Sequence, residues 1–473
     1  MHTNSKSRRL PLLIALSIML LPATVWAGRH TVNVPLPNGV DDTAHIQGAL
    51  DACVAYGPGC TVQLAAGTYF TKQVVIYNFQ GTFKGMGMDS TIIEALPNLP
   101  VNWPDNFVAS CQPNLTTCLW PSLFEFVNGN ISVSDLTIKA TAIPPAQPFL
   151  YDGLTGTELY ELLGFTGQHP TDVSVERIRM VGLPYTASTS LTGYTSDSGI
   201  HYSGDLPRSS APFDYYFLSG SLKVQSSFFD GLFAAISQDA FSTSSQITIG
   251  GSPSTGNHIE NTFSGLDLEA SEKSVLEISY NESSGSYAGM WVVPNWVPFF
   301  PSSPSSYSIH DNKFIGTGEW AGEWGNGMFL ADEVPPFIQA AVWNNTAEAE
   351  GIVSQGIGVI NTKGTVVLNN TVVGSDGTEG IGLSNTTLDT VANNNVSGFT
   401  VDSTSGLAQI YLDPSTTNDL VICAEPSNTV LNQGTKNAII GCQKSTSSAE
   451  ATTDTAPLAT RPNLPRKKLQ LPK

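Results

Sequence analysis

The stretch Ile309-His310-Asp311-Asn312-Lys313-Phe314 contains a short motif that recurs through the second half of the chain. The motif is an apolar residue, two further residues, an asparagine or a near neighbour of one, and then a small or apolar residue. Successive copies are 20, 31, 33, 25 and 25 residues apart when they are marked by Asn261, Asn281, Asn312, Asn345, Asn370 and Asn395. A regular recurrence of this kind is typical of repeat architectures.

A second motif, Gly-apolar-x-apolar, follows most copies of the first. It occurs at Gly265-Leu266-Asp267-Leu268, Gly289-Met290-Trp291-Val292, Gly327-Met328-Phe329-Leu330 and Gly380-Ile381-Gly382-Leu383. Its alternation has the period of two of a β-strand, and turn residues separate the copies. One short strand cannot bury a core alone, but strands stacked as coils of a solenoid bury a continuous one, with asparagines stacked in the turns. A β-sandwich, the main alternative, would require regular two-residue hairpin turns.

The N-terminal region predicts one helix. The run Asp41 to Cys53 begins with Asp41 or Asp42 as the N-cap, and Ile46, Leu50 and Val54 line one face. Four short segments follow it: Thr61-Val62-Gln63-Leu64, Gly67-Thr68-Tyr69, Phe83-Lys84-Gly85-Met86-Gly87 and Ser90-Thr91-Ile92-Ile93.

This order of segments closely resembles the opening of pectate-lyase-like right-handed parallel β-helix proteins, over about Pro35 to Leu96. The resemblance implies an all-β, right-handed parallel β-helix whose short N-terminal helix covers the open end of the solenoid core. It also implies a function among polysaccharide lyases, hydrolases, epimerases and non-catalytic adhesins, and the fold alone does not choose among them.

Three segments of different character divide the chain. Residues 1–27 are predicted to be a signal peptide, with Lys6, Arg8 and Arg9 before an apolar core and Val25-Trp26-Ala27 before the cleavage point. Residues 28–443 form the predicted β-helix domain, and residues 444–473 form a disordered tail rich in Ser, Thr and Pro. No later segment approaches about 18 uninterrupted apolar residues. We therefore expect a secreted or periplasmic protein without a membrane span.

The six cysteines form three neighbouring pairs, Cys53 with Cys60, Cys111 with Cys118, and Cys423 with Cys442. Six cysteines allow 15 connectivities, but each pair brackets a short segment, so local pairing is favoured. Metal binding is the alternative, but no pair has C-x-x-C spacing. The sequence predicts three structural disulfides formed in an oxidising compartment.

The charge balance limits the classes of molecule that the protein can bind. The chain has 40 acidic and 21 basic side chains and a formal net charge of −19. Such a surface repels nucleic acid and anionic membranes, and it repels a polyanionic glycan unless a divalent cation or a locally basic site intervenes. We expect an extracellular polysaccharide as the partner of a monomeric protein, no bound metal and no cofactor, with Ca²⁺ relevant only if the protein is a lyase.

Aligning the Gly-apolar motifs predicts which side chains share a face of the solenoid. One inward column contains Ile200, Ile236, Leu266, Met290 and Met328, and the next, outward column contains His201, Ser237, Asp267, Trp291 and Phe329. Two residues further along each strand come Ser203, Asp239, Glu269, Val293 and Ala331. Adjacent coils lie about 4.8 Å apart, so Asp239, Asp267 and Glu269 are predicted to form a carboxylate cluster near His201.

These residues are the candidate site. Asp239, Asp267, Glu269 and His201 are the candidate catalytic residues, because glycosidic cleavage needs two carboxyl groups with different pKa values. Trp291, Phe329, Trp320 and Trp324 are candidate platforms for sugar rings. Solvated surface carboxylates, and tryptophans packed under loops, remain the alternative interpretation of the same residues.

Insertions are predicted at residues 97–121, 143–170, 183–216 and 294–306. The motif order of the β-helical pectin hydrolases is missing, since Gln238-Asp239 and Arg177-Ile178-Arg179 only echo fragments of it in the wrong order. Two hypotheses follow. The first is a protein that cleaves or modifies an extracellular glycan through the carboxylate cluster, and the second is a non-catalytic glycan-binding or surface adhesion protein.

Overall fold

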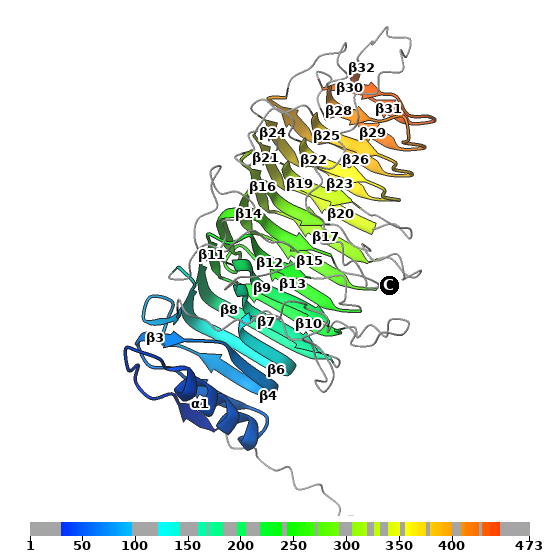
Figure 1. The fold of residues 1–473 in the computed structure, drawn as a ribbon. Helices are drawn as coiled ribbons and strands as arrows, with labels where there is room; N and C mark the ends of the chain where they lie inside the picture. Colours follow the sequence, from blue (N-terminus) through cyan, green and yellow to red (C-terminus); the bar gives the residue numbers. More distant parts are fainter. Residues whose placement is uncertain are drawn as a thin grey trace, which may run out of the picture.

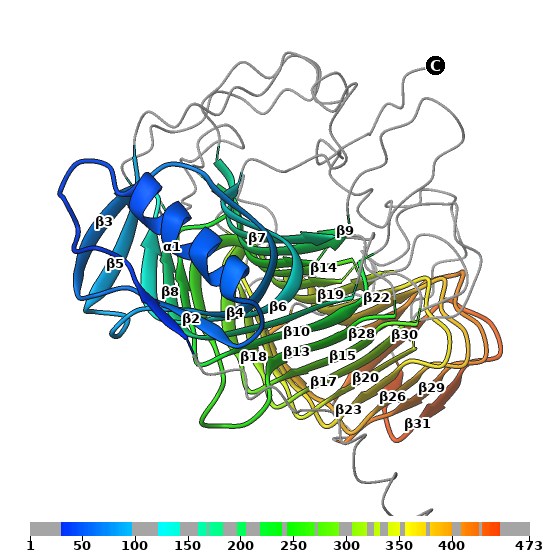
Figure 2. The ribbon, with the colours of Figure 1, turned by 90° about the horizontal axis from the view of Figure 1, so that it is seen from below.

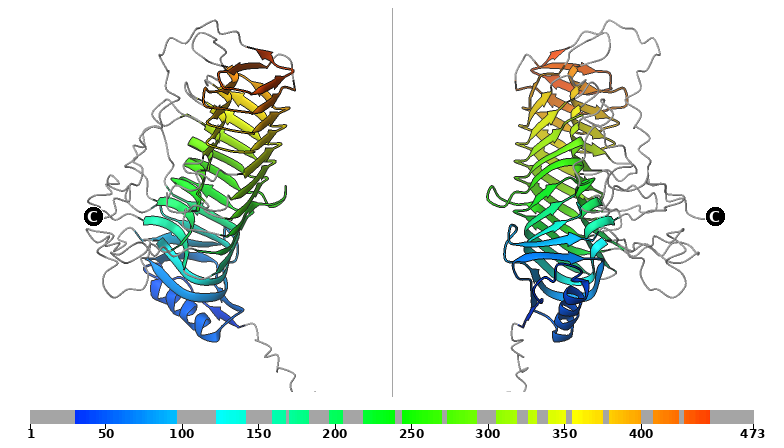
Figure 3. Two further views of the ribbon diagram at one scale, coloured as in Figure 1. Left: turned by 90° about the vertical axis from the view of Figure 1, so that its right-hand side faces the viewer. Right: turned by 60° about the vertical axis from the view of Figure 1, so that its left-hand side comes forward.

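The computed structural model describes residues 30–96, 122–141, 159–167, 170–182, 196–204, 218–238, 244–269, 273–292, 305–318, 326–331, 339–350, 355–374, 379–399, 408–424 and 428–444. Over these residues the chain forms a right-handed parallel β-helix, as the repeat and the N-terminal resemblance predicted (Figure 1). The strands stack along one axis into an elongated column (Figure 3). The predicted signal peptide lies outside the described residues, as does the predicted tail except for its first residue, Lys444, which ends the last strand.

Three parallel sheets form the sides of the column. The first sheet contains β1 (Thr31–Asn33), β2 (Cys60–Gln63), β10 (Gly220–Gln225), β13 (Gln246–Gly250), β15 (Val275–Ser279), β17 (Ser306–His310), β20 (Gln339–Trp343), β23 (Val366–Leu368), β26 (Thr390–Ala392), β29 (Leu420–Ile422) and β31 (Ala438–Ile440). The second sheet contains β3 (Gly67–Thr71), β5 (Thr91–Ala95), β11 (Phe228–Asp230), β18 (Lys313–Gly316), β21 (Thr346–Ala349), β24 (Thr371–Gly374) and β27 (Asn395–Ser397).

The third sheet carries the candidate site. It contains β7 (Leu159–Gly167), β9 (Ser196–Gly204), β12 (Ala234–Gln238), β19 (Asn326–Ala331), β22 (Gln355–Ile360), β25 (Glu379–Ser384), β28 (Ala408–Leu412), β30 (Thr429–Asn432) and β32 (Gln443–Lys444). Five longer strands bend from one sheet into another, namely β4 (Val74–Lys84), β6 (Ser122–Lys139), β8 (Thr171–Val181), β14 (His258–Leu268) and β16 (Glu282–Val292). Two strands, β7 and β9, lie within segments that the sequence predicted to be insertions, so that prediction was wrong there.

Apolar side chains fill the interior of the column. The predicted inward column is confirmed, because all five of its side chains are fully buried: Ile200, Ile236, Leu266, Met290 and Met328. Burying a side chain of this size stabilises the fold by roughly 1.5–3 kcal/mol. Each coil adds such a layer to the core.

The helix α1 (Thr43–Tyr56) covers the N-terminal end of the column (Figure 2). Its Ile46 and Leu50 are fully buried, while Val54 is partly buried against the same core. Asp42 occupies the N-cap position, but its carboxylate accepts hydrogen bonds from the backbone of Asn38 and Phe70 at 2.9 and 3.2 Å. The carboxylate of Asp41 accepts a hydrogen bond from the Thr43 amide at 3.0 Å, so the preceding aspartate pairs with the first backbone N–H of the helix.

A buried asparagine ladder runs along the turns between the first and second sheets. Asn281 donates through Nδ2 to Asn312 Oδ1 at 3.0 Å, and Asn312 donates in the same way to Asn345 at 3.0 Å. The complete ladder contains Asn257, Asn281, Asn312, Asn345, Asn370 and Asn394. The predicted stacking of asparagines is therefore confirmed, but its two terminal members were wrong, because Asn261 and Asn395 are exposed.

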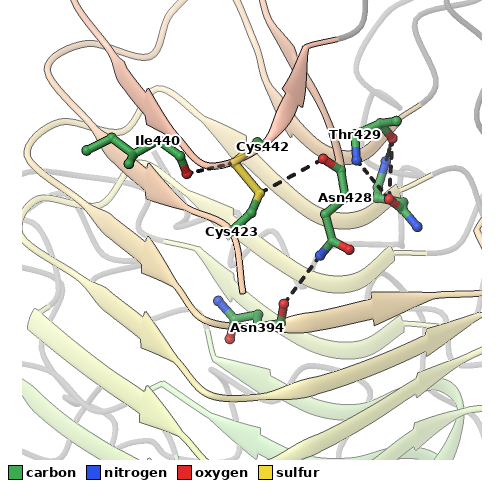
Figure 4. Close-up of a disulfide and its surroundings, with 7 residues drawn as sticks. Asn394, Cys423, Asn428, Thr429, Ile440 and Cys442 are labelled. Carbon is green, nitrogen blue, oxygen red and sulfur yellow. Dashed lines mark hydrogen bonds between the residues drawn. A yellow bond between two sulfur atoms is a disulfide. The ribbon is translucent and has the colours of Figure 1, made fainter. Parts of the chain in front are cut away.

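Two of the three predicted disulfides lie in the described residues. Cys53–Cys60 joins the end of α1 to β2, and Cys423–Cys442 ties the coil after β29 to the last strands (Figure 4). Beside the second disulfide, Asn428 Nδ2 donates to the Asn394 carbonyl oxygen at 3.3 Å. Cys111 and Cys118 lie outside the described residues, so their pairing stays a prediction. Among the described residues, no helix has the length and apolar character needed to cross a membrane.

Candidate functional site

The outward column of the third sheet has the register that the Gly-apolar motifs predicted. Ser237 pairs with His201 on one side and with Asp267 on the other. Asp267 then pairs with Trp291, and Trp291 pairs with Phe329. These side chains therefore follow one another on the consecutive strands β9, β12, β14, β16 and β19, about 4.8 Å apart.

The predicted carboxylate cluster is described only in part. Asp267 and Glu269 are both partly exposed, and the Glu269 amide donates to the Gln238 carbonyl oxygen on the neighbouring coil at 2.7 Å. Asp239, the third member, lies outside the described residues. The cluster and its catalytic role stay predictions.

Aromatic rings continue the column toward the C-terminus. The ring centroids of Trp291 and Phe329 are 4.9 Å apart, and Tyr287 lies 4.8 Å from Trp291. On the two preceding coils, Phe263 stacks on Tyr287 and Phe233 stacks on Phe263, with centroid distances of 5.2 and 4.7 Å, so the row of rings also runs back toward the N-terminus. Trp291 is partly exposed, but Phe329 is only 7% exposed, so its ring mainly supports Trp291. Trp320 and Trp324 lie outside the described residues.

At the other end of the column, His201 is paired with a glutamate that the sequence did not single out. Its Nδ1 contacts Glu161 Oε1, from the adjacent strand β7. Both side chains are almost completely buried. When Nδ1–H donates to the carboxylate of Glu161, the neutral imidazole keeps its basic nitrogen at Nε2. Glu161 therefore sets both the tautomer and the orientation of His201.

A second glutamate, Glu125 of β6, joins this pair through one serine. Ser122 Oγ lies 2.5 Å from Glu125 Oε2 and 2.6 Å from Glu161 Oε2. The hydroxyl has only one proton to donate, so one of the two carboxyl groups must be protonated and donate to the serine. Thr166 Oγ1 donates to the remaining oxygen of Glu125 at 2.6 Å.

The electrostatics identify Glu125 as the protonated member. Burial, and then the neighbouring charge of Glu161, raise the pKa of Glu125 from 4.5 to about 8. At neutral pH Glu125 is thus a neutral acid that donates to Ser122, and Ser122 donates to Glu161. Hydrogen bonds thus run from Thr166 to Glu125, from Glu125 to Ser122 and from Ser122 to Glu161, and His201 donates to Glu161 from the other side. We call these five residues the glutamate–histidine network.

Gly164 makes room for this network. It lies next to His201 in the outward column, and it also pairs with Glu125. A Cβ atom at Gly164 would come within 2.6 Å of Ser122 Oγ and closer still to both glutamates. The absence of a side chain at this position lets the two carboxyl groups lie flat against the sheet.

The glutamates were missed for a local reason. Residues 143–170 were predicted to be an insertion, so Glu161 was not assigned to a strand. Each glutamate stands alone among apolar residues, in Leu123-Phe124-Glu125-Phe126 and in Glu161-Leu162-Leu163. A lone carboxyl group in a buried strand must be paired or protonated, and that signal could have identified both.

A similar arrangement lies near the C-terminal end of the same sheet. Gln355 and Glu379 pair with each other on adjacent coils, and Gly358 pairs with Gly382. Gln355 Nε2 donates to Glu379 Oε2 at 2.6 Å. Burial raises the pKa of Glu379 from 4.5 to about 7, with a smaller contribution from the charge of Asp413. Successive pairings place Glu161 and Glu379 in one column of the sheet.

In the described part of the chain, no group of three or more His, Cys, Asp or Glu side chains has the geometry to hold a metal ion.

Comparisons with known proteins give structural neighbours only. No protein-family model and no curated protein sequence matches the chain. The A-module of mannuronan C-5 epimerase AlgE6 from Azotobacter vinelandii aligns with 12% identity and a TM-score of 0.43, over 86% of this chain and 96% of that one. DFA-IIIase from Arthrobacter chlorophenolicus A6 aligns with 11% identity and a TM-score of 0.45, over 89% and 99%.

A third neighbour is the family 28 exopolygalacturonase of Yersinia enterocolitica, with 12% identity and a TM-score of 0.36, over 88% of this chain and 76% of that one. At these identities the likeness is one of fold. The residues of this chain must carry any argument about its function.

Proposed function

We propose that this protein binds an extracellular polysaccharide along the outward face of the third sheet and cleaves or modifies it there. The observation that carries the proposal is the outward column itself, in which His201, Asp267 and Trp291 follow one another on nearby coils. A straight row of proton-transferring groups and aromatic rings suits an extended sugar chain, because each ring offers an apolar face for stacking and hydroxyl edges for hydrogen bonds.

The chemistry that we propose is acid–base catalysis at the N-terminal part of the row. Glu161 orients His201 so that Nε2 can accept a proton. Asp267 and Glu269, with Asp239 as the predicted third carboxyl group, supply the partner that donates or accepts on the other side of a glycosidic bond. We further propose that the protein works outside the cytoplasm, which the two described disulfides support.

A second candidate function is glycan binding without catalysis. The burial of His201, Glu125 and Glu161 favours it, since a covered acid–base group does not reach a substrate. In that case the glutamate–histidine network is a structural element of the solenoid, and only the aromatic residues contact the sugar.

The test is a screen of the purified mature protein against a panel of polysaccharides, with new reducing ends and unsaturated products as readouts. On the substrate found, Asp267→Asn and His201→Asn should each lower turnover by about 10²–10⁴-fold, the usual contribution of one acid–base group. The matched control is Glu282→Gln, an exposed carboxylate on the second sheet.

The melting temperature of each variant identifies losses that come only from misfolding. Full activity of a folded Asp267→Asn protein would remove this residue from the mechanism. Binding without turnover by the wild-type protein, lost on Trp291→Ala, would support the second candidate.

A further inference from the structure

Gln355 and Glu379 lie over two glycines toward the C-terminal end of the outward face. A Cβ atom at Gly358 would come within 2.6 Å of Gln355 Oε1, and one at Gly382 within 2.9 Å of Gln355 Nε2 and closer still to Glu379 Oε2. Because the glycines have no side chain, the amide and the carboxyl group lie flat on the sheet. Both side chains are partly exposed, so they form a level polar surface, which we call the Gln–Glu plate.

Aromatic residues border the plate on both sides along the column. Gly358 pairs with Phe329, whose ring supports the partly exposed Trp291. Gly382 pairs with Tyr411, which is also partly exposed and donates through its hydroxyl to Gln433 at 3.2 Å. The order along the face is therefore ring, polar plate, ring.

The hydrogen-bonding capacity of the plate is only partly used by its internal bond. A carboxyl group has two oxygens, and an amide has two N–H donors and one oxygen acceptor. A carboxylate can accept from two adjacent hydroxyl groups, as it accepts two N–H groups of a guanidinium. Adjacent hydroxyls between stacking rings are the chemistry of a sugar unit.

The charge of the face selects among sugars. Apart from the two carboxyl groups with raised pKa values, Glu125 and Glu379, acidic side chains lie along it on several coils: Glu161, Asp267, Glu269 and Asp413. The described strands β7, β9, β12, β14, β16, β19, β22, β25 and β28 contain no lysine or arginine. A polyuronate would bring a row of carboxylates against this row, in a protein whose net charge is already −19.

We propose that the Gln–Glu plate is a binding subsite for a sugar unit with two adjacent hydroxyl groups, and that the polysaccharide is uncharged. This inference rests on the proposed function, of which it names the substrate class. The carboxyl group of Glu379 and the amide of Gln355 form hydrogen bonds with the hydroxyl groups. The bordering rings of Trp291 and Tyr411 stack on the neighbouring sugar units of the same polysaccharide.

The experiment measures binding of the wild-type protein to neutral probes, namely cello-, manno- and xylo-oligosaccharides, and to acidic probes, namely oligogalacturonate and oligoalginate. We expect at least one neutral series to bind and the acidic series to bind at least about tenfold more weakly, a difference of about 1.4 kcal/mol. On the neutral ligand, Glu379→Gln and Gly382→Ala should each weaken binding about tenfold.

Two controls separate binding from folding. Glu379→Gln keeps the size of the side chain, and Gly48→Ala is the matched glycine control, since a Cβ there meets nothing within 4 Å. Gly48→Ala should bind like the wild type. Equal affinity for acidic and neutral probes, or wild-type affinity in both plate variants, would overturn the inference.

The failure of this inference is distinguishable from failure of the proposed function. If the protein binds or cleaves only polyuronates, the proposed function stands and the uncharged substrate is wrong. If neither neutral nor acidic polysaccharides are bound or changed, both proposals are wrong.

Discussion

At the scale of single residues, several buried carboxyl groups keep their protons at pH values at which ordinary surface carboxyl groups are ionised. Burial raises the pKa of Glu125 to about 8 and those of Glu379 and Asp389 to about 7. A group whose pKa is raised in the folded state binds its proton more tightly there than in the unfolded chain. Its contribution to stability is complete below the unfolded pKa and is lost as the pH rises through the folded value.

We therefore expect the melting temperature to fall as the pH rises from about 5 to about 8, because the raised pKa values span this window. Glu125→Gln should make the fall shallower. The glutamine amide can donate to Ser122 as the protonated carboxyl group does, and its oxygen can accept from Thr166. Thermal melts of both proteins across this range are the measurement.

The control for this prediction is Glu282→Gln, which removes an exposed carboxylate and should keep the wild-type slope. Asp41, whose pKa is lowered to about 2 mainly by its hydrogen bond from Thr43, contributes to the slope only at much lower pH. Parallel curves for the wild type and Glu125→Gln would mean that Glu125 is not protonated in the folded protein.

At the scale of elements, the asparagine ladder links the coils in the same way at each step. The two N–H groups of the Asn312 amide are shared among three acceptors, the Ile278 and His310 carbonyl oxygens at 2.8 and 2.9 Å and Asn345 Oδ1 at 3.0 Å. Its own Oδ1 accepts from the backbone and side chain of Asn281. One buried amide thus satisfies groups on three coils.

Asn312→Ala should destabilise the protein by about 3 kcal/mol or more, because each buried polar group left without a partner costs roughly 1–3 kcal/mol. Asn395→Ala is the matched control, since Asn395 is exposed beside the ladder and should change stability by less than about 0.5 kcal/mol. Unfolding by denaturant measures both. A similar loss in the two variants would contradict a structural role for the ladder.

The same elements show how far the sequence predicts this structure. Local sequence patterns were sufficient to predict α1 and the five-residue outward column. Both depend only on the spacing of apolar residues within one short segment of the chain. The ladder member Asn257 was missed because Ile259-Glu260-Asn261 fits the local motif equally well. The turn between β13 and β14 decides which asparagine is buried, and that turn is fixed by contacts with other coils.

The glutamate–histidine network could not be predicted from the sequence for a related reason. Its members come from β6, β7 and β9, and the chain between these strands varies in length, so no fixed spacing brings Glu125, Glu161 and His201 together. The Gln–Glu plate has a regular spacing, 24 residues from Gln355 to Glu379. Its flat arrangement depends on Gly358 and Gly382, and the repeat motif does not distinguish glycine from other residues at these positions.

At the scale of the whole molecule, the column is a stack of similar units closed at its two ends by different means. α1 covers the first coils, and the Cys423–Cys442 disulfide fastens the last ones. Between the ends, each described coil contacts chiefly the coil before and the coil after it. Stability in such a stack is approximately a sum of units and of the interfaces between neighbours.

Deleting the 25 residues Asn345–Asn369 should therefore leave a folded protein that is one coil shorter. The deletion removes β21, β22 and β23, and it brings Asn370 into the ladder position beside Asn312. We expect a β-type circular dichroism spectrum and a cooperative melt at a somewhat lower temperature. Deleting Asn345–Gly356, about half a coil, is the control and should prevent folding, because it removes Asn345 from the ladder and places β22 where β21 belongs in the second sheet.

Each step of the asparagine ladder makes the same hydrogen bonds, so the length of the column can change during evolution by whole coils. A gene that gains or loses one copy of the coil-coding unit lengthens or shortens the outward face by about 4.8 Å, without disturbing the ends. If the face binds a polysaccharide as proposed, the number of sugar units that it spans changes by recombination between neighbouring copies rather than by point substitution.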